Sequence, residues 1–320
     1  MNKNLSLFFA CVLMLSGYVH SQTTAVAVEH PPVEMPFVEG VEGFRAPVAV
    51  TEKLGFTEGP VWMPELQGVV FSDLHGSCLY FWSEAEGLEL FRENSEKGNG
   101  NFLDLEGRVI TCEGKTKRVT RLEADGSVTI LAKEFEGLDF NNPNDVTVGQ
   151  DGSVFFTDPN FGRSDREERQ FVYRIRPDGV VEKALPDSFN KPNGILMSAD
   201  GQTLYLNEGM SDRIWAYAVN ADGGVENTST PLIEGVDHVL DGLTEDPITG
   251  ELYVAVFTTH DQKPDEQGIE VYSKQGEFKG RISVPGNTTN CCFDSMGENL
   301  YVTSGGRLYK LERMRVAPEL

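Results

Sequence analysis

Six polar residues recur along the chain at nearly equal intervals, each at the start of a short apolar segment. The intervals between them are 41, 45, 49, 48 and 49 residues. We call these six the head residues: Glu58, Asn99, Asn144, Asn193, Asp241 and Asn290. Their two carboxylates and four amide oxygens are the kind of ligand that a hard cation such as Ca²⁺ prefers. If the fold brings them together, the head residues predict an oxygen-rich cation site.

Two other interpretations of this pattern are less favoured. Asn and Asp at strand starts can simply close turns, but six such residues in register favour a common site. No Cys or His recurs at these positions, so Zn²⁺ is less favoured. The chain also lacks the G-x-S-x-G, HExxH, P-loop and G-x-G-x-x-G motifs, so serine-hydrolase, zincin, nucleotide-triphosphate and Rossmann chemistry lose their usual support.

The elements that would position the head residues repeat with the same period. Each unit has an apolar strand, a turn that usually contains Gly, and a second apolar strand, as in Asn144–Asp158 (NDVTVGQDGSVFFTD). Further strands follow in most units, for example Phe171–Arg176 before the turn Pro177–Gly179. Six units of about 50 residues predict an all-β fold, a six-bladed β-propeller with four-stranded blades. A pair of β-sandwiches is the alternative, but it would not give six equal periods.

In a propeller, equivalent residues lie on a circle around the axis. The head residues begin the innermost strand of each blade, so we expect them at one end of a central, metal-containing channel. The ring must also be closed, and Pro47–Lys53 is predicted to supply the outer strand beside Leu308–Leu311 of the last blade. A single propeller domain over residues 47–320 then accounts for a length that would otherwise suggest two domains.

The N-terminal residues are predicted to lie outside this domain. Leu5–Val19 is an apolar run that is short for a membrane span, and Val19–Ser21 offers a small residue for cleavage. We therefore expect a signal peptide over residues 1–21 and a linker or N-terminal arm over 22–46. The protein would be exported, periplasmic or secreted, with no membrane attachment after cleavage. Export leaves Cys78, Cys112, Cys291 and Cys292, which the sequence allows to be disulfide-bonded or free.

The charge of the chain excludes some partners. There are 27 Lys and Arg against 50 Asp and Glu, a formal net charge of -23. Such a surface repels phosphate backbones and anionic lipids, so nucleic acid and membrane surfaces are not expected partners. Among the carboxylates near the head residues, Asp145 should point away from Asn144 along a strand, either orienting ligands from behind or closing a turn. Asp73 and Asp158 end second strands, and we expect them at the opposite end of the blade, in hydrogen bonds between blades.

The motifs around the head residues resemble those of a known family. They are Thr57–Trp62 (TEGPVW), Pro143–Val146 (PNDV), Pro192–Gly194 (PNG), Leu240–Leu243 (LDGL) and Thr289–Phe293 (TNCCF). Each is short, but together, in order and at blade spacing, they resemble the SMP-30/gluconolactonase/LRE-like family over about Val48 to Leu311. That family comprises six-bladed propellers, among them gluconolactonases and regucalcin, and is related in fold to diisopropylfluorophosphatase-type phosphotriesterases. Gly98–Phe102 (GNGNF) resembles the bacterial gluconolactonase branch.

The resemblance implies roles for most of the head residues. A divalent metal, usually Ca²⁺ with Mg²⁺, Mn²⁺ and Zn²⁺ as alternatives, would be held by Glu58, Asn193 and Asp241. Asn144 would be a metal ligand or a substrate contact, and Asp241 the catalytic base or nucleophile. We expect Asn99, Asn144 and Asn290 to contact the substrate. Some relatives carry an Arg two residues before the matching Asn, where this chain has Asn142, which weakens any transfer of their sugar-acid contacts.

The function that follows is metal-dependent hydrolysis of a small-molecule sugar lactone. One alternative is a related ester or phosphotriester hydrolase using the same site. The other is a non-catalytic, Ca²⁺-stabilised propeller that binds a partner. The substrate would be selected by two polar loops that we expect over the channel mouth, Asp158–Gln170 and Thr258–Gln267.

Overall fold

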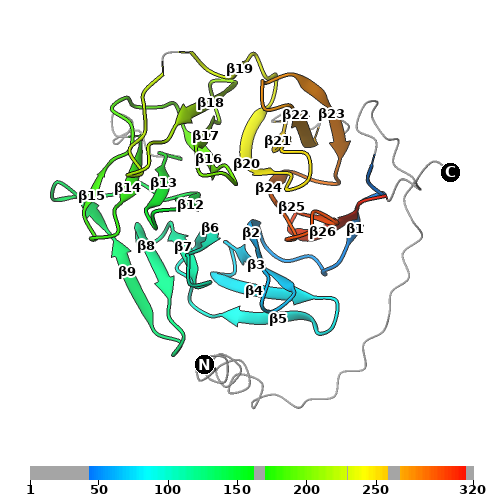
Figure 1. The fold of residues 1–320 in the computed structure, drawn as a ribbon. Coiled ribbons are helices and arrows are strands. Elements are labelled where there is room, and N and C mark those ends of the chain that lie inside the picture. The colour runs from blue at the N-terminus through cyan, green and yellow to red at the C-terminus, as the bar shows by residue number, and fades with distance from the viewer. Residues whose placement is uncertain (1–42, 162–169, 229, 259–266, 315–320) are drawn as a thin grey trace, which may run out of the picture.

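The computed structural model describes residues 43–161, 170–228, 230–258 and 267–314. These residues form β-sheets arranged as six blades around a central axis (Figure 1). The prediction of an all-β, six-bladed propeller with four-stranded blades is confirmed. The signal peptide and nearly all of the predicted arm lie outside the described residues. Within the described part, no helix is long and apolar enough to cross a membrane.

Each blade is an antiparallel sheet, and in blades 1 to 5 the strands run outward from the axis in chain order. Blade 1 has β2 (Thr57–Met63), β3 (Gly68–Asp73), β4 (Cys78–Ser83) and β5 (Gly87–Arg92). Blade 2 has β6 (Gly98–Leu103), β7 (Val109–Glu113), β8 (Arg118–Leu122) and β9 (Val128–Ala132). Blade 3 has β12 (Val146–Val148), β13 (Val154–Asp158), β14 (Phe171–Ile175) and β15 (Val181–Lys183). A short hairpin of β10 (Glu134–Phe135) and β11 (Leu138–Asp139) precedes blade 3.

The second half of the ring repeats this plan. Blade 4 has β16 (Pro192–Met197), β17 (Thr203–Glu208), β18 (Arg213–Ala218) and β19 (Ile233–Glu234). Blade 5 has β20 (Val239–Glu245), β21 (Leu252–Phe257), β22 (Gly268–Tyr272) and β23 (Phe278–Ser283). Blade 6 has β24 (Thr288–Phe293), β25 (Asn299–Ser304) and β26 (Arg307–Glu312), and its fourth strand is β1 (Val48–Ala49).

The two ends of the described chain meet in blade 6 and close the ring. Strand β1 pairs with β26 in antiparallel register, with Val48 opposite Lys310, so the predicted closure is confirmed. The hydroxyl of Thr51 accepts a hydrogen bond from the backbone N–H of Leu308 at 3.0 Å. Closure by pairing leaves the first and last blades without a gap between them, which keeps the inner strands in a fixed ring.

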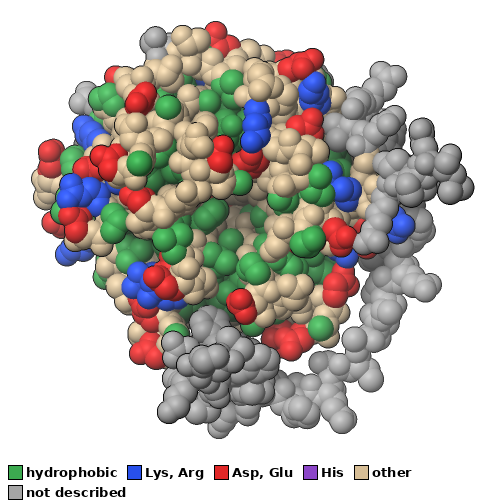
Figure 2. All heavy atoms as spheres, in the orientation of Figure 1, with side chains coloured by type: hydrophobic (Ala, Val, Ile, Leu, Met, Phe, Trp, Pro, Cys, Tyr) green, Lys and Arg blue, Asp and Glu red, His purple; other side chains and the backbone are tan. Residues whose placement is uncertain are grey.

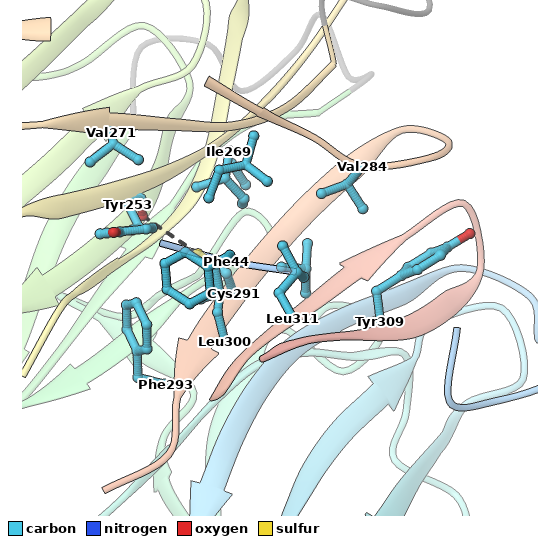
Figure 3. Packing of buried hydrophobic residues seen from close by; sticks show 13 residues of the cluster. Phe44, Tyr253, Ile269, Val271, Val284, Cys291, Phe293, Leu300, Tyr309 and Leu311 are labelled. Carbon is cyan, nitrogen blue, oxygen red and sulfur yellow. Dashed lines mark hydrogen bonds between the residues drawn. The ribbon is translucent and has the colours of Figure 1, made fainter. Parts of the chain in front are cut away.

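Each blade packs face to face against the two neighbouring blades, and apolar side chains fill the space between the sheets. Figure 3 shows one such layer, where Tyr253, Ile269 and Val271 of blade 5 face Leu300 and other buried residues of blade 6. The middle strands are therefore almost continuously apolar, as in Leu252–Phe257 (LYVAVF), instead of alternating. In the face shown in Figure 2, the disc is hollowed at its centre and hydrophobic side chains gather in the hollow. The channel thus carries apolar walls as well as the polar head residues.

Phe44 joins this layer although it lies before the first strand. It is 1% exposed, and its ring packs edge-on against Tyr253, with 6.1 Å between centroids. The guanidinium of Arg313 lies 4.7 Å from its centroid. The ordered propeller therefore extends a few residues into the segment expected to be an arm.

We expect Phe44→Ala to lower the free energy of unfolding by about 3–5 kcal/mol, because it empties a fully buried aromatic site at the ring closure. Val48→Ala is the matched control, since the Val48 side chain is 61% exposed and should change stability by less than about 0.5 kcal/mol. Denaturant unfolding of both variants measures the difference. Equal stabilities would show that Phe44 is not part of the closure.

Candidate metal and substrate site

The head residues all lie at the same end of the inner strands and are buried. Their exposed fractions run from 4% for Glu58 to 7% for Asn99 and Asp241. Nδ2 of Asn193 donates to the backbone carbonyl of Leu240, beside Asp241, at 3.3 Å. The Asn193 and Asn290 amides lie close enough to the carboxyls of Asp241 and Glu58, respectively, to lower the pKa of each. The structure therefore places carboxylates and amides from blades 1, 4, 5 and 6 in one centre. Asn99 and Asn144 lie beside them, joined to neighbouring blades through their backbone carbonyls.

Asp145 also belongs to this centre, which the sequence analysis had not predicted. Regular alternation would turn its side chain away from the channel, but β12 begins only at Val146, so residue 145 is not in a regular strand. Its Oδ1 accepts a hydrogen bond from the N–H of Val146 at 3.0 Å. Its Oδ2 accepts one from Nδ2 of Asn290, in the opposite blade of the ring, at 3.4 Å. Asp145 thus reaches into the channel and contacts blade 6.

Irregular backbone at the head residues explains how consecutive residues can both face the centre. In five of the six inner strands the pairing register shifts at the head residue, as between Glu58 and Val61 and between Leu240 and Leu243. A bulge breaks the strict alternation of a strand and re-aims side chains. The expectation that Asp145 points away assumed a regular strand, and this assumption was wrong.

The residue after the head position is glycine in four blades: Gly59, Gly100, Gly194 and Gly242. Because these glycines have no side chain, polar groups of neighbouring blades can lie against them. A Cβ at Gly100 would lie 2.3 Å from Oδ1 of Asp145, and one at Gly242 would lie 1.9 Å from Cγ of Asn290. Glycine at this position in four of the other five blades is the sequence signal that could have identified Asp145, because Asp145 lies in the space beside Gly100 that a side chain there would fill.

We expect Gly242→Ala to displace the Asn290 amide and to lower the free energy of unfolding by about 1–3 kcal/mol, because the added methyl group overpacks a buried site. Gly224→Ala is the matched control, since the nearest atoms to its Cβ would belong to the exposed side chains of Asp222, at 3.1 Å, and Asn220, at 3.7 Å. Thermal unfolding of both variants tests the difference. A Gly242→Ala protein as stable as the control would mean that the Asn290 amide is free to move.

Three carboxyl groups are buried together in this centre, and this raises their pKa values. Loss of hydration is the largest cause for each of them. The pKa of Glu58 rises to about 8, with the Asp145 charge as the second cause, and the pKa of Asp145 rises to about 7. Asp241 has its pKa raised well above the usual value, with further contributions from Glu58 and Asp145. No Lys or Arg among the described residues forms an ion pair with any of the three.

The amide groups of the centre differ in what they can offer. Oδ1 of Asn193 is buried and has no hydrogen-bond partner within the described part of the chain. Such an orphaned acceptor is costly unless something else contacts it. Asn290 instead uses Oδ1 to accept from the N–H of Cys291 at 2.8 Å, and directs its Nδ2 at Asp145. Asn193 is therefore free to act as an oxygen ligand, whereas Asn290 is oriented as a donor toward carboxylates.

These residues fit a divalent cation. The uncompensated carboxyls of Glu58, Asp145 and Asp241, together with the orphaned Asn193 oxygen, are hard oxygen donors of the type that Ca²⁺ prefers. No group of three or more His, Cys, Asp or Glu side chains arranged to hold a metal is found among the described residues. Any cation site here therefore depends on the amide oxygens as well. The metal in the channel stays a prediction.

Hydrogen bonds from side chains of one blade to backbone carbonyls of the next hold the head residues independently of their own side chains. Three of them reach the carbonyl of a head residue: Ser72 to Asn99, Thr157 to Asn193 and Asn207 to Asp241. The fourth runs from Thr289 to the carbonyl of Thr57, directly before Glu58. The distances are 2.6–2.8 Å. This network sets the positions of the inner strands relative to one another.

The prediction for Asp73 and Asp158 was wrong. Asp73 is the register partner of Thr57, so it lies at the same end of its blade as Glu58, because neighbouring strands are antiparallel. Its carboxylate accepts from the N–H groups of Gly55 and Phe56, at 3.1 and 3.0 Å. Asp158 accepts in the same way from Asn141 and Asn142. Both carboxylates therefore hold the segment that leads into the inner strand of their own blade.

The remaining sequence predictions have mixed outcomes. Cys78, Cys112, Cys291 and Cys292 are free thiols in the structure. Burial raises the pKa of Cys112 and Cys291 well above the usual value, so these two remain protonated. Most of the two predicted substrate loops, at 162–169 and 259–266, lies outside the described residues.

The fold and this centre define a six-bladed propeller with a buried, oxygen-rich group of carboxyls and amides at one end of its channel. The family model for the SMP-30/gluconolactonase/LRE-like region matches residues 56–306. The chain belongs to this family, as the motifs around the head residues predicted.

Individual relatives agree with this assignment. A gluconolactonase of Zymomonas mobilis is 25% identical over 311 residues, which cover 86% of this chain and 84% of the relative. A pentonolactonase of Haloferax volcanii is 24% identical and covers 78% and 81% of the two chains. The solved structure of a gluconolactonase from Xanthomonas campestris superposes with a TM-score of 0.77 at 28% identity, covering 88% of this chain and 97% of that one.

Proposed function

We propose that this protein is a metal-dependent hydrolase that opens a sugar lactone at the centre formed by the head residues and Asp145. The observation that carries the proposal is the burial of Glu58, Asp145 and Asp241 together, with no positive side chain paired to them among the described residues. Such a cluster is unfavourable unless a cation joins it. Ca²⁺ is the cation that best matches the donors, with Mg²⁺, Mn²⁺ and Zn²⁺ as alternatives.

The relatives support lactone hydrolysis. Two of them are named as a gluconolactonase and a pentonolactonase, and each is aligned over more than three quarters of both chains. The prediction that the chain is an enzyme of the lactonase class is confirmed by this agreement. The particular sugar, the metal and the roles of individual residues belong to the proposal.

In the proposed mechanism, Glu58, Asn144, Asn193 and Asp241 would hold the metal, and the metal would supply a Lewis acid for the lactone carbonyl. Asp241 accepts a proton from the attacking water as the water oxygen bonds to the carbonyl carbon, and it returns that proton to the ring oxygen when the lactone C–O bond breaks. If Asp241 attacks the carbonyl itself, the ring oxygen leaves and takes up a proton, and water then hydrolyses the resulting anhydride to regenerate the carboxylate. Asn99 and Asn144 donate hydrogen bonds that orient the substrate. Asn290 contributes by holding Asp145 and Glu58 through its Nδ2. Its predicted role as a direct substrate contact becomes secondary to this one.

The decisive experiment removes and restores the metal. The purified protein is treated with a chelator, and hydrolysis of glucono-δ-lactone is followed with and without added Ca²⁺, Mg²⁺, Mn²⁺ or Zn²⁺. We expect activity to disappear on chelation and to return best with Ca²⁺. Full activity in the metal-free protein would exclude the metal role.

The same experiment separates the two alternatives. A panel that adds aryl esters and phosphotriesters to the lactones would show faster turnover of those substrates if the protein is a related ester or phosphotriester hydrolase. Ca²⁺-dependent melting without turnover of any substrate would indicate a non-catalytic propeller whose ion is structural.

We also propose that the protein is exported, with residues 1–21 removed as a signal peptide. Its apolar run Leu5–Val19 supports this, and extracellular compartments supply enough Ca²⁺ to fill even a weak site. N-terminal sequencing of the mature protein tests it, and a chain that still begins at Met1 would contradict it.

A further inference from the structure

Two lysines occupy the same position in the repeat, two residues before a head residue. Lys97 precedes Asn99 in KGNG, and Lys191 precedes Asn193 in KPNG. Their surroundings are also equivalent. The carbonyl of Lys97 accepts from the N–H of Gly114 at 3.1 Å, and that of Lys191 from the N–H of Gly209 at 2.9 Å. The lysines therefore lie at matching places in blades 2 and 4, on either side of blade 3, at the end of the ring where the head residues lie.

Both lysines have a backbone conformation that is unfavourable for them. Their φ angles are 59° and 61°, in the left-handed region that glycine adopts without steric cost. Non-glycine residues held in this region tend to cluster at functional sites, where the side chain is needed despite the strain. Lysine occurs at both positions although glycine would adopt this backbone conformation more easily. This repetition points to a role for the ammonium groups.

These ammonium groups are not used in ion pairs within the described residues, unlike other cations of the same region. Lys115 is 2.8 Å from Glu96, and Arg92 and Arg118 are both bonded to Glu113. The Nζ of Lys191 instead donates to the backbone carbonyl of Asn160, at 2.5 Å, just after β13 of blade 3. Lys97 is exposed. Neither positive charge is therefore offset by a carboxylate among the described residues.

Asn142, which leads into the inner strand of blade 3, lies close to Lys97 of blade 2. A Cβ on Gly114 would lie 2.5 Å from Oδ1 of Asn142 and 3.5 Å from the carbonyl oxygen of Lys97, so these two groups converge there. Asn142 stands at the repeat position of the lysines in blade 3. Lys97, Asn142 and Lys191 therefore occupy the same repeat position in three consecutive blades, 2, 3 and 4.

We propose that Lys97 and Lys191 bind an anionic substituent of the substrate, so that the preferred substrate is a sugar lactone carrying a carboxylate or a phosphate. This inference rests on the proposed function. The centre holds three acidic groups, so even with a divalent cation its net charge is negative when all of them are ionised. In a protein of formal net charge -23, an anionic lactone would be repelled unless local positive charges offset that field. The two lysines supply these charges where the substrate must enter.

The test compares three lactones at matched ionic strength: neutral glucono-δ-lactone, 6-phosphoglucono-δ-lactone and glucaro-1,4-lactone with its free carboxylate. For the metal-loaded wild type we expect a higher kcat/KM on at least one anionic lactone, falling steeply as salt is added. Which anionic lactone is preferred distinguishes phosphate from carboxylate. In Lys97→Gly and Lys191→Gly we expect kcat/KM on that lactone to fall about tenfold more than on the neutral one, mainly through KM.

Two further measurements keep the outcome unambiguous. Lys115→Gln is the matched control, because Lys115 is paired with Glu96, and its kcat/KM values should match those of the wild type. Melting temperatures of the two glycine variants should not fall, because glycine relieves the left-handed strain. A wild type that opens no lactone would refute the proposed function. This inference would be overturned if the wild type opened neutral and anionic lactones with equal kcat/KM. It would also be overturned if the glycine variants lost the same fraction of kcat/KM on both kinds of lactone. Either result would leave the proposed function standing.

Discussion

Asp241→Asn should abolish turnover and at the same time stabilise the metal-free protein. We expect kcat to fall by about 10³-fold, because the variant loses the group that accepts the proton or attacks the carbonyl. Metal-free wild-type protein buries three acidic groups that repel one another, and the pKa of Asp241 is raised well above its usual value in part by Glu58 and Asp145. Replacing one of the three by a neutral amide removes that repulsion, which should raise Tm by about 2–4 °C per kcal/mol relieved.

The backbone at this position should survive the change. Nδ2 of Asn207 donates to the carbonyl oxygen of Asp241 at 2.6 Å, and this bond does not involve the mutated side chain. Asp125→Asn is the control, since Asp125 is exposed on a hairpin tip and should alter neither kcat nor Tm. Lactonase assays and melting curves with and without chelator test both halves. Wild-type turnover in Asp241→Asn would remove Asp241 from the mechanism.

The second large effect concerns pH and metal together. In the unfolded chain the carboxyls of Glu58 and Asp145 ionise near their ordinary values of 4.5 and 3.8, but in the metal-free folded protein they ionise near pH 8 and pH 7. Between these limits the folded state keeps protons that the unfolded state has released, so stability falls as pH rises. Each group contributes up to about 1.4 kcal/mol per pH unit, and we expect the metal-free protein to lose several kcal/mol between about pH 5 and pH 8.

Metal should cancel this dependence, because a bound cation favours the ionised carboxylates. Urea unfolding across this pH range, with chelator and with saturating Ca²⁺, measures the difference. A Glu58→Gln variant serves as the control, and its metal-free stability should depend less steeply on pH. A metal-free wild type whose stability is constant or rises from pH 5 to pH 8 would show that the three carboxyls are not buried as a group.

The fold could be predicted because the sequence pattern of a blade repeats at nearly equal intervals. Six head residues at intervals of 41 to 49 residues identify the blades without any knowledge of their packing. The closure was also predictable, since Pro47–Lys53 had no partner within its own unit and β26 needed one. The same period identified the group of residues that the structure brings together.

The positions of Asp145 and Asp73 could not be predicted from the sequence, because they depend on local backbone geometry and on how the strands turn back. The start of β12 at Val146 is a property of the backbone, and it leaves Asp145 outside the regular strand, so that its side chain can face the channel. Asp73 was misplaced for a different reason: the end of a second strand returns to the start of the first, so it lies beside Glu58. The orientation of the Asn290 amide depends on Asp145 and could not be known without it.

The pairing of β1 with β26 has a consequence for how the protein folds. These strands come from opposite ends of the described chain, so the contact between Val48 and Lys310 is of very long range in sequence. Contacts of this kind form late and slow the folding of β proteins. Until they form, the outer edge of β26 has unpaired backbone groups that can recruit strands of other molecules. We expect this seam to be the last part of the ring to gain amide-exchange protection during refolding, and the place where aggregation of the newly made chain begins.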